Sequence, residues 1–297
     1  MRRVDFFDAP EKTVLAIGGF DGVHTAHRVL LSQAVRRART EGFAPAVFTF
    51  AGGLPQKDAA LMTDEERLSI FREAGVARVF LFSFSEVSEM MPDVFFREVL
   101  SRICRASAAV CGENFRFGKG ASGDASLLGS FLPTLIIPSI TDGEGVISST
   151  RIRRAVRDGD MPLAARLLGM PYTLTGRVTH GRRLGHTLGF PTANIDLSES
   201  LCLPKHGVYA ARVGVGESSY PAVANIGVRP TVTADGTVNC ESHLIGFSGD
   251  LYGKEIRVSL IAFLREEKQF ASQNELRLQI DCDRKEAEKW LNSVGHS

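Results

Sequence analysis

Short apolar runs alternate with amphipathic stretches through the first half of the chain. Between these runs, apolar residues recur at helical spacing, and Thr63 with Glu66 forms the capping box of one such helix. Strands that alternate with helices predict βαβ units and a parallel sheet, so we expect an α/β domain. In such a sheet, ligands bind beyond the carboxyl ends of the strands. The runs that predict strands are residues 13–18, 45–50, 77–82, 107–112 and 133–138.

The pattern changes near residue 170. A short helix is expected to end at Gly169, and Pro171 follows as a further stop signal. Strand-like segments then follow one another without helices between them, which favours an antiparallel β-barrel with a C-terminal helix. We therefore expect two domains, residues 1–170 and residues 171–297. The predicted strands of the second domain are 172–179, 207–213, 221–226, 240–247 and 256–264, and the helix spans about 272–291.

Composition narrows the class of protein. The 297 residues suffice for two ordinary domains, and 44% hydrophobic with 23% charged residues is typical of a soluble globular chain. A net charge of +1 gives no general attraction to nucleic acid or to a membrane, so neither is expected as a partner. Five cysteines, without C-x-x-C spacing, predict neither a disulfide framework nor a zinc cluster.

The chain shows no targeting or membrane segment in its sequence pattern. Two aspartates interrupt the first ten residues, so they do not form a signal peptide. No apolar run approaches the ~20 residues that a membrane helix needs. Together with the cysteine usage, this predicts a cytoplasmic protein. Whether it forms a homo-oligomer is left open.

Three polar loops follow strands of the first half. The loop 19–24, GFDGVH, leads into a helix whose start carries His24 and His27, three residues apart and thus on one face. The other loops are 112–118, GENFRFG, and 147–153, ISSTRIR. Helix N-termini, imidazoles, hydroxyls and arginines can hold a polyphosphate. In the alternative interpretation the hydroxyls cap a helix and the histidines are structural, but three such junctions together favour a nucleotide site.

A glycine-rich run, residues 176–194, opens the second domain with GRVTHGRRLGHTLGFPTAN. Glycine allows left-handed backbone and close approach to a ligand, and successive N–H groups form nests for phosphate. Thr192 and Asn194 offer neutral oxygens of the kind that Mg²⁺ takes beside phosphates. The run predicts either a nucleotide loop or a turn-rich barrel corner, and its spacing alone favours neither. Its glycines are Gly176, Gly181, Gly185 and Gly189.

The motifs GGFDGVHTAH, CGENFRFG and ISSTRIR resemble, in order and spacing, the adenylyltransferase half of bacterial FAD synthetases, which are HxGH nucleotidyltransferases. The resemblance covers about residues 12–168 and implies a Rossmann-like domain that transfers AMP from ATP to FMN and releases pyrophosphate. By motif match, His24 and His27 would be catalytic, binding and polarising the ATP phosphates. The other implied ATP-binding residues are Gly18, Phe20, Asp21, Gly22, Asn114, Ser148, Ser149, Thr150 and Arg153.

The first half departs from that family in three places. Gly19 stands where the family usually has Asn, and Ala26 stands where it has Gly. Residues 51–55 follow Phe50 as AGGLP, where the family has a Phe-x-Pro-His-Pro motif. These departures leave open whether the first domain still transfers AMP.

The second half resembles the riboflavin kinase domain of the same bifunctional enzymes across residues 172–270. The matching segments are HGRRLGHTLGFPTANI, HGVYAARV, NIGVRPTV, ESHLIGF, GDLYGKEIRV and FLREEKQF. The resemblance implies γ-phosphoryl transfer from ATP to the riboflavin 5′-hydroxyl, with Glu241 as the general base. Thr192 and Asn194 would ligate Mg²⁺ and phosphate oxygens. The implied ATP-binding residues are Gly176, Gly181, Gly185, Gly189, Pro191, Thr192 and Asn194.

The resulting prediction is a bifunctional enzyme that makes FMN from riboflavin in its second domain and FAD from FMN in its first. Both steps would use ATP and Mg²⁺. Riboflavin, FMN and ATP are the expected partners, with FMN and FAD as products. Two alternatives are kept: a monofunctional riboflavin kinase with a degenerate first domain, and a non-catalytic flavin-binding or regulatory protein.

Overall fold

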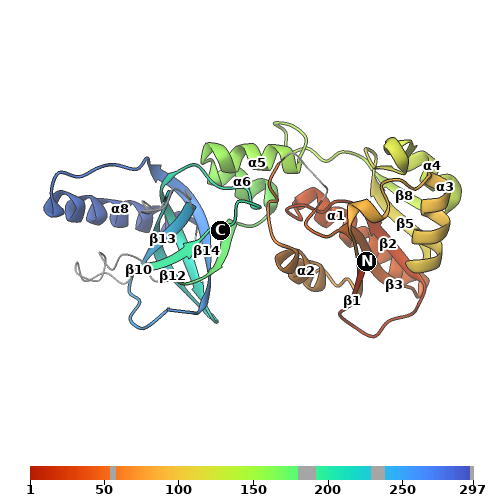
Figure 1. Cartoon of the computed structure of the whole chain (residues 1–297), viewed down its shortest axis with the longest axis horizontal. Helices are drawn as coiled ribbons and strands as arrows, with labels where there is room; N and C mark the ends of the chain where they lie inside the picture. Colours follow the sequence, from red (N-terminus) through yellow and green to blue (C-terminus); the bar gives the residue numbers. More distant parts are fainter. Residues whose placement is uncertain (54–57, 180–191, 229–237, 295–297) are drawn as a thin grey trace. The chain divides into compact units, whose positions relative to one another are not determined.

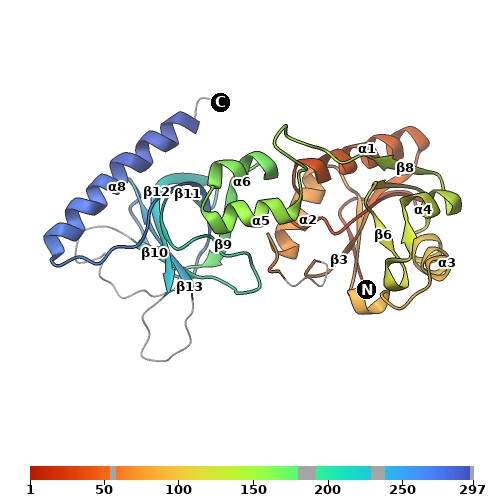
Figure 2. The same cartoon turned by 90° about the horizontal axis from the view of Figure 1, so that it is seen from above.

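A computed structural model describes residues 1–53, 58–179, 192–228 and 238–294 of the chain. The chain divides into two compact units, Met1–Ser149 and Thr150–Ser297. Each unit has its own sheet (Figure 1 and Figure 2) and its own hydrophobic core. Among the described residues, no helix is both long and apolar enough to cross a membrane.

The first unit is built on a six-stranded sheet of order β1-β4-β3-β2-β5-β8. Every residue of β2 and of β4 is buried, as expected for central parallel strands covered on both faces. The predicted α/β domain is confirmed. The parallel strands are β2 (Thr13–Ile17), β3 (Ala44–Phe50), β4 (Arg78–Phe82), β5 (Ala106–Gly112) and β8 (Thr134–Ile137).

One edge of this sheet departs from the predicted parallel arrangement. Strand β1 (Arg2–Asp5) pairs antiparallel with β4. It has four residues, three of them charged and most of them exposed, so its sequence carries no hydrophobic pattern from which a strand could be predicted. A short hairpin of β6 (Arg116–Phe117) and β7 (Gly123–Asp124) was likewise not predicted.

The helices of the first unit begin where the capping signals predict. Thr63 and Glu66 form the predicted capping box at the start of α2, and Gly42 ends α1 in the left-handed conformation. Helix α1 packs against β2, β3 and β5. The helical segments are α1 (Thr25–Glu41), α2 (Asp64–Glu73), α3 (Pro92–Val94) continued as a π-helix over Phe95–Ile103, α4 (Ala125–Phe131), and 3₁₀ turns at Phe84–Glu86 and Lys119–Ala121.

The second unit contains a six-stranded antiparallel sheet of order β10-β13-β12-β11-β14-β9. A bridge between Thr179 and Asn194 joins the chain after β9 to β10, so the two ends of this order meet and the sheet closes as a barrel. The predicted antiparallel barrel is confirmed. The strands are β9 (Tyr172–Arg177), β10 (Thr192–Asp196), β11 (Gly207–Val215), β12 (Ser218–Val228), β13 (Val238–Leu244) and β14 (Glu255–Arg265).

In the described part of the second unit, three helices accompany the barrel. α5 (Ser149–Asp158) and α6 (Met161–Leu168) precede it, and α6 packs against β9 and β14. These helices thus lie in the compact unit of the barrel, whereas the predicted domain boundary near residue 170 follows them. The predicted C-terminal helix is α8 (Gln273–Val294), which packs on β11, β12 and β14.

Candidate active sites

His24 is the N-cap residue of α1. Its Nδ1 accepts a hydrogen bond from the backbone N–H of His27 at 3.3 Å. The two imidazole rings stack, with their centroids 3.6 Å apart, as the three-residue spacing predicts. Because Nδ1 of neutral His24 is an acceptor, its proton must lie on Nε2. The Nε2–H group of His24 can therefore donate a hydrogen bond to a ligand.

Both imidazoles are held in the neutral form. Burial lowers the pKa of His24 to about 4. Burial, and then the charges of His24 and Arg67, hold the pKa of His27 well below its ordinary value. Nδ1 of His27 is buried and has no hydrogen-bond partner in the described part of the chain. The pair can therefore offer neutral N–H donors to a phosphate rather than two imidazolium charges.

The loop that precedes α1 has a strained backbone. Phe20 and Val23 have φ angles of 48° and 35°, in the left-handed region that residues with a Cβ seldom adopt. Both side chains are fully buried, and Gly22 also has a positive φ of 83°. Strain of this kind persists only where the surroundings enforce it, and it clusters at functional sites. The loop thus suits a ligand-binding role.

Asp21 anchors this loop through its side-chain carboxylate and through its backbone carbonyl. Its Oδ1 accepts from the backbone N–H of Leu61 at 2.8 Å, and its carbonyl accepts from the hydroxyl of Ser149, also at 2.8 Å. The N–H of Gly18 donates to the carbonyl of Phe48 at 3.2 Å. Ser149, predicted to hold ATP, therefore also fixes the loop of residues 19–23. Ser148 precedes it and is half-buried.

Asn114 lies in an exposed turn that follows β5. Because β5 and β2 are parallel neighbours, their carboxyl ends meet at one edge of the sheet, and the loops that carry Asn114 and His24 leave from that edge. Oδ1 of Asn114 lies 3.0 Å from where a Cβ of Gly112 would stand. The Asn114 side chain thus folds back over Gly112.

Thr150 and Arg153 belong to α5 and to the second compact unit. Thr150 is exposed, and the Arg153 side chain is buried. Within that unit, the Arg153 carbonyl faces the thiol of Cys202 at 3.9 Å. The part of both residues in ATP binding stays a prediction.

The structure accounts for two of the three departures from the family pattern. Ala26 lies in the first turn of α1, where alanine suits a helical backbone better than glycine does. Gly52 and Gly53 have φ angles of 68° and 83°, and the N–H of Gly52 donates to the carboxylate of Asp64. A proline at position 52 could supply neither the positive φ nor the N–H group, so this turn requires glycine there. Leu54 and Pro55 lie outside the described residues.

The predicted kinase residues lie on one face of the barrel. Asn194 of β10 is paired directly opposite Glu241 of β13, and Thr192 is opposite His243. Directly opposed residues share a face of an antiparallel sheet, so these four side chains form one polar row. The intervening residues are fully buried in the barrel core, so the row lies on the opposite, outer face, where Asn194 is still only 5% exposed and the other three are half-buried. The intervening residues are Ala193, Ile195, Cys240 and Ser242.

Two further asparagines flank this row, and sequence reasoning missed both. Nδ2 of Asn239 donates to Oδ1 of Asn194 at 3.2 Å. Asn225 of β12 is opposite Glu241, and its Nδ2 donates to Glu267 at 3.1 Å. Glu241 thus lies between asparagines on both neighbouring strands. The signal that could have found them is strand register, which the sequence pattern does not fix.

The structure describes only part of the glycine-rich run. Gly176 lies inside β9, within the predicted strand 172–179, and its part in ATP binding stays a prediction. A Cβ at this position would lie 3.0 Å from Cβ of Ile195, which gives a packing reason for glycine. Thr192 and Asn194 are likewise strand residues. The predicted ATP-binding residues Gly181, Gly185, Gly189 and Pro191 lie outside the described residues.

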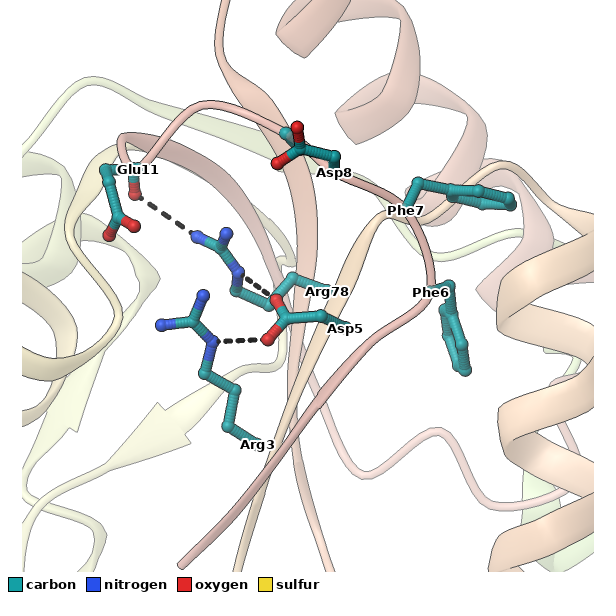
Figure 3. A pocket seen from close by; sticks show the side chains of 8 residues that line it. Arg3, Asp5, Phe6, Phe7, Asp8, Glu11 and Arg78 are labelled. Carbon is teal, nitrogen blue, oxygen red and sulfur yellow. Dashed lines mark hydrogen bonds and ion pairs between the residues drawn. The ribbon is translucent and has the colours of Figure 1, made fainter.

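A polar surface hollow of about 410 Å³ lies at the opposite end of the first sheet (Figure 3). Arg3 and Arg78 both donate to the carboxylate of Asp5, at 2.8 and 2.5 Å. Burial tends to raise the pKa of Asp5, but the hydrogen bonds and charges of the two arginines lower it overall. Arg78 begins β4, so the hollow is at the amino ends of the strands, away from His24. It is lined by Arg3, Asp5, Phe6, Phe7, Asp8, Ala9, Glu11 and Arg78.

Comparison with known proteins agrees with this division of the chain. An FAD synthetase family model matches residues 7–151, and a riboflavin kinase family model matches residues 168–291. A bifunctional riboflavin kinase/FMN adenylyltransferase from Escherichia coli K12 is 39% identical, covering 92% of this chain and 91% of its own. The Bacillus subtilis protein of the same description is 32% identical, covering 95% and 94%.

The chain belongs to the bifunctional riboflavin kinase/FMN adenylyltransferase family. A solved structure from Streptococcus pneumoniae, described as a macrolide-efflux protein, has the same fold, with a TM-score of 0.87 and 30% identity over 96% of both chains. The FAD synthetase match contains the His24 loop and Asn114, and the riboflavin kinase match contains Asn194 and Glu241. The predicted family, fold and enzyme class are confirmed, and the residue roles stay predictions.

Proposed function

We propose that the second unit phosphorylates riboflavin to FMN and that the first unit adenylylates FMN to FAD. The observation that carries the kinase assignment is the pairing of Glu241 with Asn194 on the outer face of the barrel. A carboxylate base beside an asparagine and a threonine suits transfer of phosphate to a hydroxyl, whereas binding of flavin alone needs no base.

In the kinase step, Glu241 would take the proton of the riboflavin 5′-hydroxyl as its oxygen attacks the γ-phosphorus of ATP and ADP leaves. Such assistance is typically worth about 10²–10⁴-fold in rate. The donor set fits Mg²⁺, because Thr192 and Asn194 present neutral oxygens on the face that carries Glu241. These two residues would hold the ion, and its charge would stabilise negative charge that develops on the transferred phosphate. Asn239 would keep the Asn194 amide in one orientation.

In the adenylyl step, an FMN phosphate oxygen would attack the α-phosphorus of ATP, and pyrophosphate would leave. No nucleophile from the protein is needed, so positioning and charge stabilisation do the work. The neutral His24 and His27 supply N–H donors at the start of α1, where the helix dipole already favours phosphate. Asn114 would contribute from the neighbouring loop.

The deciding experiment incubates the full chain with riboflavin, ATP and Mg²⁺ and separates the flavins by chromatography. FMN followed by FAD is the expected product series. FMN that accumulates without FAD would favour the monofunctional alternative, and the absence of both products would leave a binding role. The macrolide-efflux description belongs to the pneumococcal protein, and both family matches of this chain name catalytic domains.

Expectations about the ligands, the location and the domain boundary accompany this proposal. ATP, riboflavin and FMN are the proposed ligands, and a cytoplasmic location fits the cysteine usage. The domain boundary near residue 170 stays a prediction, and it follows the start of the riboflavin kinase match at residue 168 closely. The oligomeric state is left to measurement.

A further inference from the structure

Arg67 of α2 is a buried cation, although it follows three acidic residues, 64–66, in the sequence. Only 2% of its side chain is exposed. Its Nη1 donates to the carbonyl of Gly19 at 3.0 Å and to the hydroxyl of Thr49 at 3.2 Å. Its Nη2 donates to the carbonyl of Phe50 at 2.6 Å and pairs with Asp64. Burial of a guanidinium is unfavourable unless it is paired and hydrogen-bonded, and both Nη groups of Arg67 have such partners.

The carbonyl of Gly19 is the point at which Arg67 meets the strained loop. It accepts from both Thr49 Oγ1 and Arg67 Nη1, each at 3.0 Å. The next residue is Phe20, with its φ of 48°. Two donors on this carbonyl fix the peptide plane that leads into the strained residue. The centroid of the Phe20 ring in turn lies 5.1 Å from that of the His27 ring, so the position of Phe20 restricts the position of the His27 ring.

The other partners of Arg67 hold the loop after β3. Both carboxylate oxygens of Asp64 accept from the N–H of Gly52, at 3.1 and 3.0 Å. Arg67 binds the same carboxylate and the carbonyl of Phe50 that closes this turn. One buried side chain therefore joins the loops that follow β2 and β3. Both loops lie at the carboxyl edge of the sheet.

We propose that Arg67 is a positioning residue for adenylyl transfer. Arg67 does not touch substrate. It holds the Gly19–Phe20 peptide and the turn at Phe50–Gly53 in the arrangement that positions the His27 side chain. The inference rests on the proposed adenylyl transfer in this unit. Its expected signature is a loss in kcat, because misplacement of catalytic groups by about 1 Å can lower the rate by about 10²-fold.

The test compares Arg67→Met, Arg67→Lys and Thr49→Val with Arg72→Met, which changes an exposed arginine of the same helix. FAD formation from FMN and ATP·Mg is measured in the full chain, with kcat and both KM values. FMN formation from riboflavin in the same preparation is the internal reference, and circular dichroism during heating reports folding.

Arg67→Met should lower kcat for FAD formation by about 10- to 100-fold, with both KM values changed by less than about threefold. Arg67→Lys should recover part of kcat, since an ammonium can reach the Gly19 carbonyl but cannot serve both loops as a planar fork can. Arg72→Met should match the wild type. Should Arg67→Met fail to fold, Thr49→Val decides: it removes one donor from the Gly19 carbonyl and should still lower kcat measurably.

Folded variants with kcat within twofold of the wild type would overturn the positioning role, as would an equal loss in Arg72→Met. A loss confined to KM would assign Arg67 to substrate binding instead and would also overturn it. A wild-type chain that makes no FAD from FMN would refute the proposed function itself. The two failures are therefore distinguishable.

Discussion

The backbone N–H of His27 donates to Nδ1 of His24 at 3.3 Å, and their rings stack at 3.6 Å. One histidine thus caps the helix that carries the other. The same contact fixes the tautomer of His24, so its Nε2–H is directed to a ligand only while Nδ1 stays unprotonated. Protonation of His24 would break the cap and add charge beside the His27 ring.

This arrangement predicts an acid-sensitive first unit. Burial lowers the folded-state pKa of His24 from 6.5 to about 4. The unfolded chain therefore binds a proton that the folded chain does not, so stability is present above pH 6.5 and falls as the pH drops towards 4. At about 1.4 kcal/mol for each pKa unit, the full loss is about 3 kcal/mol.

His24→Asn should reduce this pH dependence to the part that comes from buried His27, because asparagine keeps the cap and removes the His24 ring. Urea unfolding at several pH values between 4 and 7 measures it. His206→Asn, at an exposed histidine of the second unit, is the control. Parallel curves for the wild type and His24→Asn would contradict the assignment.

Glu241→Gln should nearly abolish FMN formation while FAD formation from supplied FMN survives. Glutamine keeps the shape of the side chain but cannot accept the hydroxyl proton, so a loss of about 10²–10⁴-fold in kcat is expected. The reciprocal control is His27→Ala, which should impair FAD formation and leave FMN formation intact. Both activities are followed by chromatography of flavins. A joint loss in either variant would mean that the two reactions do not have separate sites.

Periodicity predicted most of the strands and helices because they are either buried throughout or regularly amphipathic. Periodicity did not predict strands whose local sequence is typical of a loop. Strand β10 begins with Thr192, in a run of glycines, and β1 is short and charged. In both cases the strand exists because a neighbouring strand offers hydrogen bonds. That is tertiary information that a single segment does not carry.

The same limit applies to the candidate sites. His24, His27 and Glu241 could be proposed from motifs that they share with a family. Arg67 could not, because it stands in the run DEER, which reads as the solvated face of a helix. Its burial depends on the Thr49 hydroxyl and the Gly19 carbonyl, which lie 18 and 48 residues earlier in the chain. Asn239 was missed for a similar reason, since its contact with Asn194 depends on strand register.

Asn239→Ala should lower kcat for FMN formation without affecting FAD formation. Its Nδ2 donates to Oδ1 of Asn194, and without it the Asn194 amide is free to rotate. A neutral hydrogen bond is worth about 0.5–1.5 kcal/mol, so a loss of about 2- to 10-fold is expected. Asn239→Asp should lower kcat at least as much, because it places a carboxylate oxygen, which can only accept, opposite Oδ1 of Asn194, which also accepts. Steady-state kinetics with riboflavin measures both, and wild-type kcat in Asn239→Asp would exclude a role in orienting Asn194.

Gly176→Ala should destabilise the barrel rather than weaken nucleotide binding. A Cβ would stand 3.0 Å from Cβ and 3.3 Å from Cγ2 of Ile195, and the backbone there is ordinary strand that alanine accepts. Overpacking of this kind costs about 1–3 kcal/mol. Gly214→Ala is the matched control, because a Cβ there meets its nearest atoms at 3.8 Å.

The measurements are urea unfolding of the full chain and the KM for ATP in FMN formation. Gly176→Ala should unfold at lower urea than Gly214→Ala, with the KM for ATP unchanged in both. Because the crowding lies between residue 176 and Ile195, adding Ile195→Ala should remove the contacts with Cγ2 and Cδ1, and the two changes together should cost less than their sum. A raised KM with unchanged unfolding would instead assign Gly176 to the nucleotide, as its position in the glycine-rich run first suggested.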